Sequence, residues 1–139
     1  MRLDSSTARE RLAAADHGVL GTVHAERGAH LVPVVFALDG DRLAIPIDRV
    51  KPKSTTRLQR SANVEADPRA TLLVEHWDRH DWSMLWWVRA DMRSVSVDDH
   101  VSKRLTELIV EKHPQYRDTV FERLLTFEVV SLTGWSAAG

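Results

Sequence analysis

The sequence predicts a β-rich α+β fold, an antiparallel β-barrel with short peripheral helices, formed as a single domain over residues 1–139. Two observations predict this class. Apolar, β-prone runs separated by turn signals occupy the centre of the chain, and helical spacing is confined to short segments around them. A chain of this length also buries about 68–70% of its unfolded surface, which is sufficient for one core. Periodicity alone does not identify which barrel is formed.

The first half of the chain predicts one helix followed by strands. The helix is expected over residues 6–16, after three candidate capping residues and before the break at His17-Gly18. Pro33 and Pro46 lie inside two of the predicted strands. Because proline donates no ladder hydrogen bond, each marks a sheet edge, a bulge or a place where a ligand replaces the neighbouring strand. The predicted strands cover residues 19–25, 30–38 and 42–47.

The second half of the chain predicts two more helices. The shorter one precedes the turn Asp67-Pro68 and places Leu58 and Ala62 on its inward face. The longer one has an apolar stripe, two Asp residues at its N-terminus and Pro114 at its end. The expected elements are helices over 54–62 and 98–113 and strands over 70–77, 82–94 and 124–133.

Composition excludes several classes of function. The formal net charge of −1 argues against bulk attraction to nucleic acid or to an anionic membrane. The chain has no cysteine, which excludes disulfides, thiolate nucleophiles and Cys-based metal sites and fits a reducing cytoplasm. No secretory signal is visible, and no apolar run approaches the roughly 20 residues that span a bilayer. We therefore expect a cytoplasmic protein with no nucleic-acid partner and no membrane span.

A basic segment at residues 49–64 is the strongest candidate for a binding site. Lys53, Arg57 and Arg60 fall at i, i+4 and i+7, so they share one face of the predicted helix. Ser54 lies at the helix start, where unpaired N–H groups and the helix dipole favour an anion such as phosphate. A solvated basic helix that only keeps the protein soluble is an equally good reading of the spacing. The segment has no acid, and its cations are Arg49, Lys51, Lys53, Arg57 and Arg60.

The tryptophans form a second cluster. Four of the five fall within residues 77–87, and on a strand Trp82, Met84, Trp86 and Val88 share one face, opposite Trp87. Since one small barrel cannot easily bury both faces, we expect one face to meet a partner subunit or a ring-shaped ligand. Packing of all four in the core is the alternative. The expected substrate or dimer cleft consists of Trp77, Trp82, Trp86, Trp87, Arg89 and Trp135.

Other signatures of chemistry are missing from the sequence. His76 and His80 are four residues apart, but they span a predicted strand end and loop, where this spacing gives no common face, so no metal site is expected. The chain also lacks the G-x-S-x-G, P-loop and G-x-G-x-x-G motifs. Hydrolase, nucleotide-hydrolase and Rossmann-type functions therefore have no support.

The order of these features resembles a known family. The matching stretches are GTVHAERGAHLVPVVFAL, KPKSTTRLQRSANVEADPRATLLVEHW, DWSMLWWVRAD and LTGWS, which together span roughly residues 5 to 136. This set is similar to the pyridoxamine 5'-phosphate oxidase-like split β-barrel proteins, and especially to their actinobacterial relatives that depend on the deazaflavin coenzyme F420. One departure is that Met92 follows Asp91, where the family commonly has glycine. A side chain there is expected to narrow the site or to alter a bulge.

The resemblance implies a homodimer with two equivalent cofactor sites at the subunit interface. Lys53 and Ser54 align with the family's phosphate-binding positions, and the backbone of the predicted strands lines the isoalloxazine ring. A ring held edge-on by backbone would explain Pro33 and Pro46. The expected cofactor-binding set is Lys51, Lys53, Ser54, Arg57, Arg60, Val32, Pro33, Val34 and Ile47.

The function that follows is an oxidoreductase in which the cofactor performs the chemistry. Reduced coenzyme F420 would pass a hydride to an electron-poor small molecule such as a quinone, an enone or a tetrapyrrole. Five cations within 12 residues exceed what one phosphate requires, which favours the anionic tail of coenzyme F420 over FMN. An FMN-dependent oxidoreductase remains an alternative, as does a non-catalytic flavin- or tetrapyrrole-binding protein.

Overall fold

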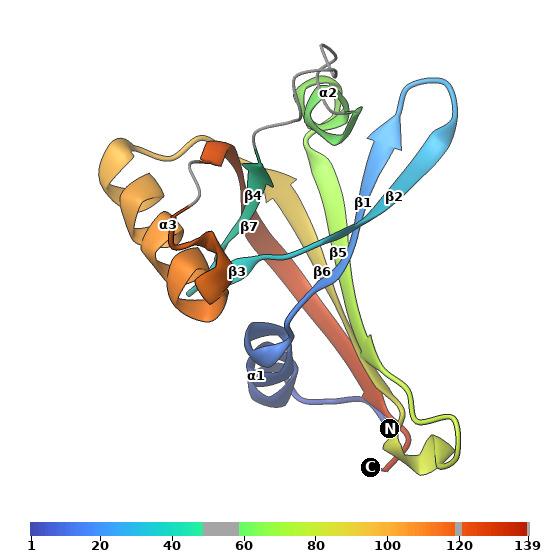
Figure 1. Ribbon diagram of the computed structural model, residues 1–139. Coiled ribbons are helices and arrows are strands. Elements are labelled where there is room, and N and C mark those ends of the chain that lie inside the picture. Colours follow the sequence, from blue (N-terminus) through green and yellow to red (C-terminus); the bar gives the residue numbers. More distant parts are fainter. Residues whose placement is uncertain (49–58, 119–120, 139) are drawn as a thin grey trace.

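Strands of one antiparallel sheet form the body of the protein, seen in a computed structural model that describes residues 1–48, 59–118 and 121–138 (Figure 1). Within these residues the sheet has seven strands in the order β2-β1-β5-β6-β7-β4-β3. The strands are β1 (Gly18–His24), β2 (Gly28–Val34), β3 (Ala37–Asp39), β4 (Arg42–Asp48), β5 (Arg69–His76), β6 (Trp86–Ser94) and β7 (Phe121–Ser136). The helices are α1 (Ser5–Ala14), α2 (Gln59–Ala66) and α3 (Asp99–Lys112), with 3-10 turns η1 (Trp82–Met84) and η2 (Pro114–Tyr116). The predicted antiparallel, β-rich class with peripheral helices is confirmed.

The two edge strands are neighbours in the sequence, and this closes the sheet into a barrel. Only Val35 and Phe36 separate β2 at one edge from β3 at the other, and Figure 1 shows the chain crossing from β2 into β3 beside α3. β4 pairs with β7 from Arg42 to Asp48, but it pairs with β3 only at Arg42, Leu43 and Ala44. The far half of β4 therefore has no β3 partner, and the barrel is split between β2 and this half.

Two predicted strands are interrupted in the structure. The expected strand over 30–38 divides into β2 and β3, because the chain leaves one edge of the sheet after Val34 and joins the opposite edge at Ala37. The expected strand over 82–94 begins only at Trp86. Before it, the Asp81 carboxylate accepts hydrogen bonds from the Ser83 N–H and hydroxyl and stabilises η1 instead of an extended chain. The prediction that Trp82 and Met84 lie on the strand is therefore wrong.

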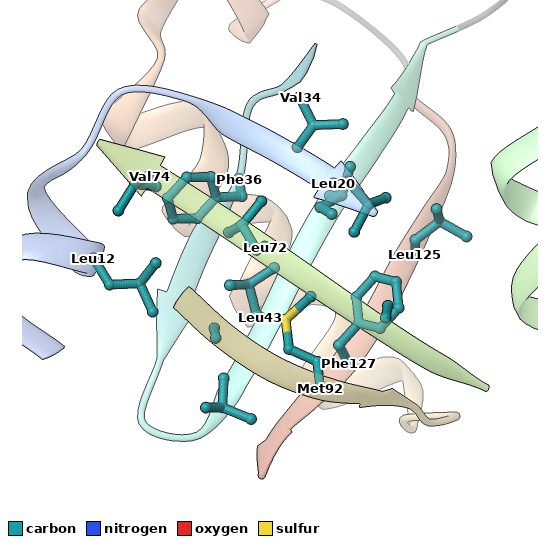
Figure 2. Close-up of a cluster of buried hydrophobic side chains, with 14 of the residues drawn as sticks. Leu12, Leu20, Val34, Phe36, Leu43, Leu72, Val74, Met92, Leu125 and Phe127 are labelled. Atoms are coloured by element: carbon teal, nitrogen blue, oxygen red, sulfur yellow. The ribbon is translucent and has the colours of Figure 1, made fainter. Parts of the chain in front are cut away.

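The core fills the barrel from several elements. Figure 2 shows Leu12 of α1 and Phe36 of the β2–β3 connection pointing toward strand side chains such as Leu72 and Phe127. Met92 also belongs to this core, beside a register shift between β6 and β7. The side chain of Met92 therefore packs inside the barrel at a bulge rather than on the surface of the sheet.

α3 covers β3 and the part of β4 that pairs with it. The apolar stripe that its spacing predicted is present, and Leu105 and Ile109 of this stripe pack against Ala37 of β3 and Ala44 of β4. The Asp98 carboxylate accepts a hydrogen bond from the Val101 N–H and caps the helix, and the helix ends before Pro114. Within the described ranges, no helix combines the length and apolar character that a membrane crossing requires.

Candidate functional site

The split in the barrel holds a cleft of about 310 Å³. We call it the split cleft. Its lining combines residues of β2 and of the connection that follows with one residue of β4, one of α2, one of η2 and one that precedes β1. These residues are His17, Pro33, Val34, Val35, Pro46, Arg60 and Tyr116.

The prolines explain why the barrel stays open here. Pro33 pairs with Val19 on one side of β2, and β2 is the edge strand on the other side. Pro46 pairs with Leu124 of β7 and lies beyond the last residue of β4 that β3 reaches. Neither proline has an N–H to donate, so β2 and this half of β4 cannot pair as a regular antiparallel or parallel ladder. Of the three positions expected for a proline in a strand, Pro33 has the sheet edge, and both prolines line the cleft.

Three members of the predicted cofactor set meet at this cleft: Pro33, Val34 and Arg60. Val32 packs partly against the core and Ile47 is buried in it, so their side chains do not line the cleft. Lys51, Lys53, Ser54 and Arg57 fall outside the described residues. Their predicted contact with a phosphate stays a prediction.

Of the five cations in the basic segment, Arg60 is the one that the structure describes. It does not lie on the outward face of the helix, where it was predicted. The buried residues of α2 are Ser61, Asn63 and Val64, whereas Ala62 is only half-buried. Arg60 precedes Asn63 by three residues and Val64 by four, so it shares their inward face and is itself half-buried. The sequence prediction that cations lie opposite the inward face is therefore wrong for Arg60, because a polar residue, Asn63, points inward.

Three residues of the cleft, Val35 and the polar His17 and Tyr116, were not predicted from the sequence. His17 follows α1, and Tyr116 ends η2 between α3 and β7. Together with Arg60 they bring imidazole, phenol and guanidinium groups to a cleft whose other walls are proline and valine. Such a lining can hold a flat apolar ring and a polar or anionic substituent. No local pattern places His17 and Tyr116 together, since they meet only through the fold.

Lys112 links α3 to the β2–β3 connection, which forms one wall of the cleft. Its Nζ donates a hydrogen bond of 3.2 Å to the Phe36 carbonyl oxygen and lies 4.1 Å from the centre of the Phe36 ring. Burial lowers the pKa of this amine, and the nearby Asp16 carboxylate opposes the shift. The contact holds Val35 and Phe36, and hence one wall of the cleft, against α3.

The tryptophans divide into three environments. Trp77 and Trp82 lie on the loop between β5 and β6, are 56% and 68% exposed, and meet edge to face with ring centres 5.8 Å apart. Trp86 packs against the core, stacks with the His76 ring and lies under the Arg11 guanidinium. Trp87 lies on the outer face of the sheet.

Trp87 contacts two other residues of the predicted substrate or dimer cleft. It pairs in register with Trp135 of β7, and the Arg89 guanidinium lies 5.5 Å from the centre of its ring. Two environments, the exposed loop and the outer face, therefore provide aromatic surface outside the core. None of the predicted tryptophans lines the split cleft.

The outer face of the sheet carries an apolar patch next to the cleft. We call Val19, Leu31 and Leu73 the outer patch, and Leu31 is 66% exposed. Val19 pairs with Pro33 on one side and with Leu73 on the other, so the patch continues across the strands to the wall of the cleft. Among the described residues, no group of three or more His, Asp or Glu side chains is placed to hold a metal ion.

Comparison with known proteins identifies the fold. No protein-family model matches the sequence, and no curated protein matches it significantly. Among solved structures, an FAD-binding protein from Mesorhizobium loti is 16% identical with a TM-score of 0.68, over 96% of this chain and 93% of that one. A candidate pyridoxamine 5'-phosphate oxidase from Corynebacterium glutamicum is 11% identical with a TM-score of 0.60, over 98% of both chains.

A heme-binding protein from Mycobacterium smegmatis is also similar, at 12% identity and a TM-score of 0.69, over 94% of this chain and 56% of that one. These identities are too low to transfer a ligand or an activity, but the alignments cover nearly the whole described fold. The chain therefore has the split β-barrel fold of the pyridoxamine 5'-phosphate oxidase-like type.

Proposed function

We propose that this chain is an oxidoreductase that binds coenzyme F420 in the split cleft, with FMN as the alternative cofactor. The observation that carries the proposal is the meeting of Pro33, Val34 and Pro46 with Arg60 around one cleft. Flat apolar walls with a cation among them suit a planar ring whose side chain carries a phosphate.

The size of the cleft fits part of such a cofactor. Its volume of about 310 Å³ lies at the lower end of the range for ligand pockets, so it accepts a ring system but not a long tail. The phosphate and the anionic tail would extend toward the basic segment, whose Lys53 and Ser54 precede Arg60 by a few residues. The surplus of cations in that segment is the reason for preferring coenzyme F420 to FMN.

The reduced cofactor would supply a hydride to an electron-poor acceptor such as a quinone, an enone or a tetrapyrrole-like molecule. The protein's own residues bind and orient. Pro33 and Pro46 would lie beside the ring and exclude water, and Arg60 would balance its negative charge. His17 and Tyr116 carry donors that can hold a carbonyl oxygen of the acceptor in the same cleft.

The proposal includes a homodimer with its cofactor sites at the subunit interface. The outer patch exposes apolar surface that reaches Pro33, and the row of Trp87, Arg89 and Trp135 residues extends the same outer face. A second copy packed on this face would cover the patch and complete the open side of the cleft. The exposed Trp77 and Trp82 would then meet the partner subunit or the substrate.

The similar structures support a flavin-type cofactor without choosing one. The Mesorhizobium loti protein is an FAD-binding protein, which favours a flavin-type ring in this fold. The Mycobacterium smegmatis protein binds heme, which favours the second candidate function, tetrapyrrole binding without turnover. The two functions differ in the cofactor that binds and in whether it is reoxidised.

A titration tests the proposal directly. Purified protein is titrated with coenzyme F420, FMN and heme, followed by fluorescence quenching or absorbance, and repeated with Arg60→Ala and with Lys53→Ala. Loss of a charge-assisted hydrogen bond is worth about 1.5–3 kcal/mol, so each variant is expected to weaken binding by roughly 10- to 100-fold. Arg104→Ala removes the same charge from an exposed position of α3 and serves as the matched control.

The outcomes separate the candidates. Micromolar binding of coenzyme F420, followed by reoxidation of its reduced form with a quinone or an enone, supports the leading proposal. Binding of FMN alone supports the alternative cofactor, and binding of heme without turnover supports the non-catalytic function. If none of the three binds at micromolar concentration, the proposed function is overturned. An unchanged Kd in Arg60→Ala would show that Arg60 does not bind the cofactor.

A further inference from the structure

A short chain of buried polar groups connects α2 to β1. The Asn63 Nδ2 donates a hydrogen bond of 2.9 Å to the Thr22 hydroxyl, and the Gln59 Nε2 donates one of 2.7 Å to the Asn63 Oδ1. Thr22 and Asn63 are each only 3% exposed, although both are polar and lie 41 residues apart in the sequence. A buried polar group without a partner costs free energy, so the folded state favours the arrangement in which Asn63 and Thr22 are hydrogen-bonded.

Apolar packing alone does not determine how α2 is rotated about its axis. In the described part of the helix, Val64 is the one hydrophobic residue that joins the core. A helix of eight residues also has little stability of its own and takes its orientation from tertiary contacts. The hydrogen bond to Thr22 can form in only one rotation, because the amide and the hydroxyl must align within hydrogen-bond geometry.

That rotation also decides where Arg60 points. Arg60 and Asn63 are three residues apart and therefore lie on the same face of the helix. A rotation that breaks the contact between Asn63 and Thr22 also turns Arg60 away from Pro33 and Pro46. We propose that Thr22 and Asn63 are positioning residues that hold Arg60 in the split cleft. The inference rests on the proposed function, since it concerns binding of the anionic cofactor by Arg60.

The test uses substitutions that separate positioning from stability. Thr22→Val removes the hydroxyl and keeps the shape, and Thr22→Ser keeps the hydroxyl. Ser61→Ala removes a hydroxyl that is equally buried in the same helix but lies outside the chain of hydrogen bonds. The Kd of each variant is measured for the cofactor that the parent protein binds. Thr22→Val is expected to weaken binding roughly fivefold or more, and the other two variants are expected to bind as the parent does.

A double-mutant cycle shows whether the effect passes through Arg60. In an Arg60→Ala background, Thr22→Val is expected to cause no further loss of affinity, because the cation that it positions is gone. Independent, multiplying effects overturn the inference, as does a Thr22→Val variant with a lower Tm and an unchanged Kd. If Thr22→Val fails to fold, Gln59→Met cuts the half-buried end of the same chain and is judged by the same cycle.

A second measurement separates this inference from the proposed function. The rate of Arg60 modification by phenylglyoxal, read by mass spectrometry, needs no cofactor. Thr22→Val is expected to raise that rate severalfold, whereas Thr22→Ser and Ser61→Ala are expected to leave it unchanged. If the parent binds no cofactor, the proposed function fails while this readout still decides the position of Arg60. An unchanged rate in Thr22→Val overturns the inference.

Discussion

Gly18→Ala is expected to destabilise the protein, whereas Gly21→Ala on the same strand is expected to be tolerated. A Cβ at Gly18 would lie 2.8 Å from the Leu73 carbonyl oxygen and 3.0 Å from Val74 Cγ1. The carbonyl is backbone, so relief requires β1 and β5 to move apart next to His17 of the split cleft. A Cβ at Gly21 would lie 3.1 Å from Leu31 Cδ2, the end of an exposed side chain that can turn away.

The magnitude follows from two opposing effects. Overpacking in a well-packed region costs about 1–3 kcal/mol. Replacing glycine by alanine at a position without positive φ returns about 0.4–1 kcal/mol through the entropy of the unfolded chain. Neither Gly18 nor Gly21 has positive φ, so the second effect applies to both. The net loss for Gly18→Ala is about 1–2 kcal/mol, which lowers the Tm by about 3–8 °C. Gly21→Ala should stay within about 0.5 kcal/mol of the parent.

Urea unfolding followed by tryptophan fluorescence measures the difference. Both variants and the parent are compared at one protein concentration, since a dimer makes stability depend on concentration. Equal m-values show that the substitutions leave the surface exposed on unfolding unchanged, so that a shift of the midpoint reports a change in stability. The reasoning is refuted if Gly18→Ala is as stable as Gly21→Ala.

Three further predictions follow from single residues. Phe36→Ala should cost about 3–5 kcal/mol in urea unfolding, because the ring is fully buried at the β2–β3 connection; a cost below about 1 kcal/mol would contradict that packing. Hydrogen bonds from Arg69 lower the pKa of Asp67 to about 2 from its usual 3.8, so its contribution to stability is present above pH 3.8 and is lost as the pH falls through about 2. Asp67→Asn should therefore show a difference from the parent that shrinks between pH 4 and pH 2, and a constant difference in urea unfolding would argue against the ion pair. Trp77→Ser combined with Trp82→Ser should lower the free energy of unfolding by no more than about 1.5 kcal/mol, since both rings are exposed, and should weaken self-association in sedimentation equilibrium; unchanged association would remove this loop from the proposed interface.

Elements specified by neighbouring residues were predicted closely. The helix expected over 98–113 is observed as Asp99–Lys112, because its cap, its apolar stripe and its terminating proline all lie within one segment. The strands predicted on either side of residues 39–41 also pair as a hairpin, β3 with β4, and Gly40 has the positive φ that such a turn requires. Failures occurred where a distant contact outweighs local preference. The crossing of the chain from one sheet edge to the other divides one predicted strand, and Asn63 turns inward because Thr22 of β1 offers it a partner.

The split cleft shows the same division. The basic run, the two strand prolines and the cluster of tryptophans were visible in the sequence, since each is a local departure from an ordinary pattern. The meeting of Pro33 with Pro46, and of Arg60 with His17 and Tyr116, depends on a barrel whose edge strands come together only after the whole sheet has formed. The sequence by itself determined the chemical groups that this protein offers, because side-chain chemistry is local. Only the tertiary structure decided which of them share a cleft, because that depends on contacts between residues far apart in the chain.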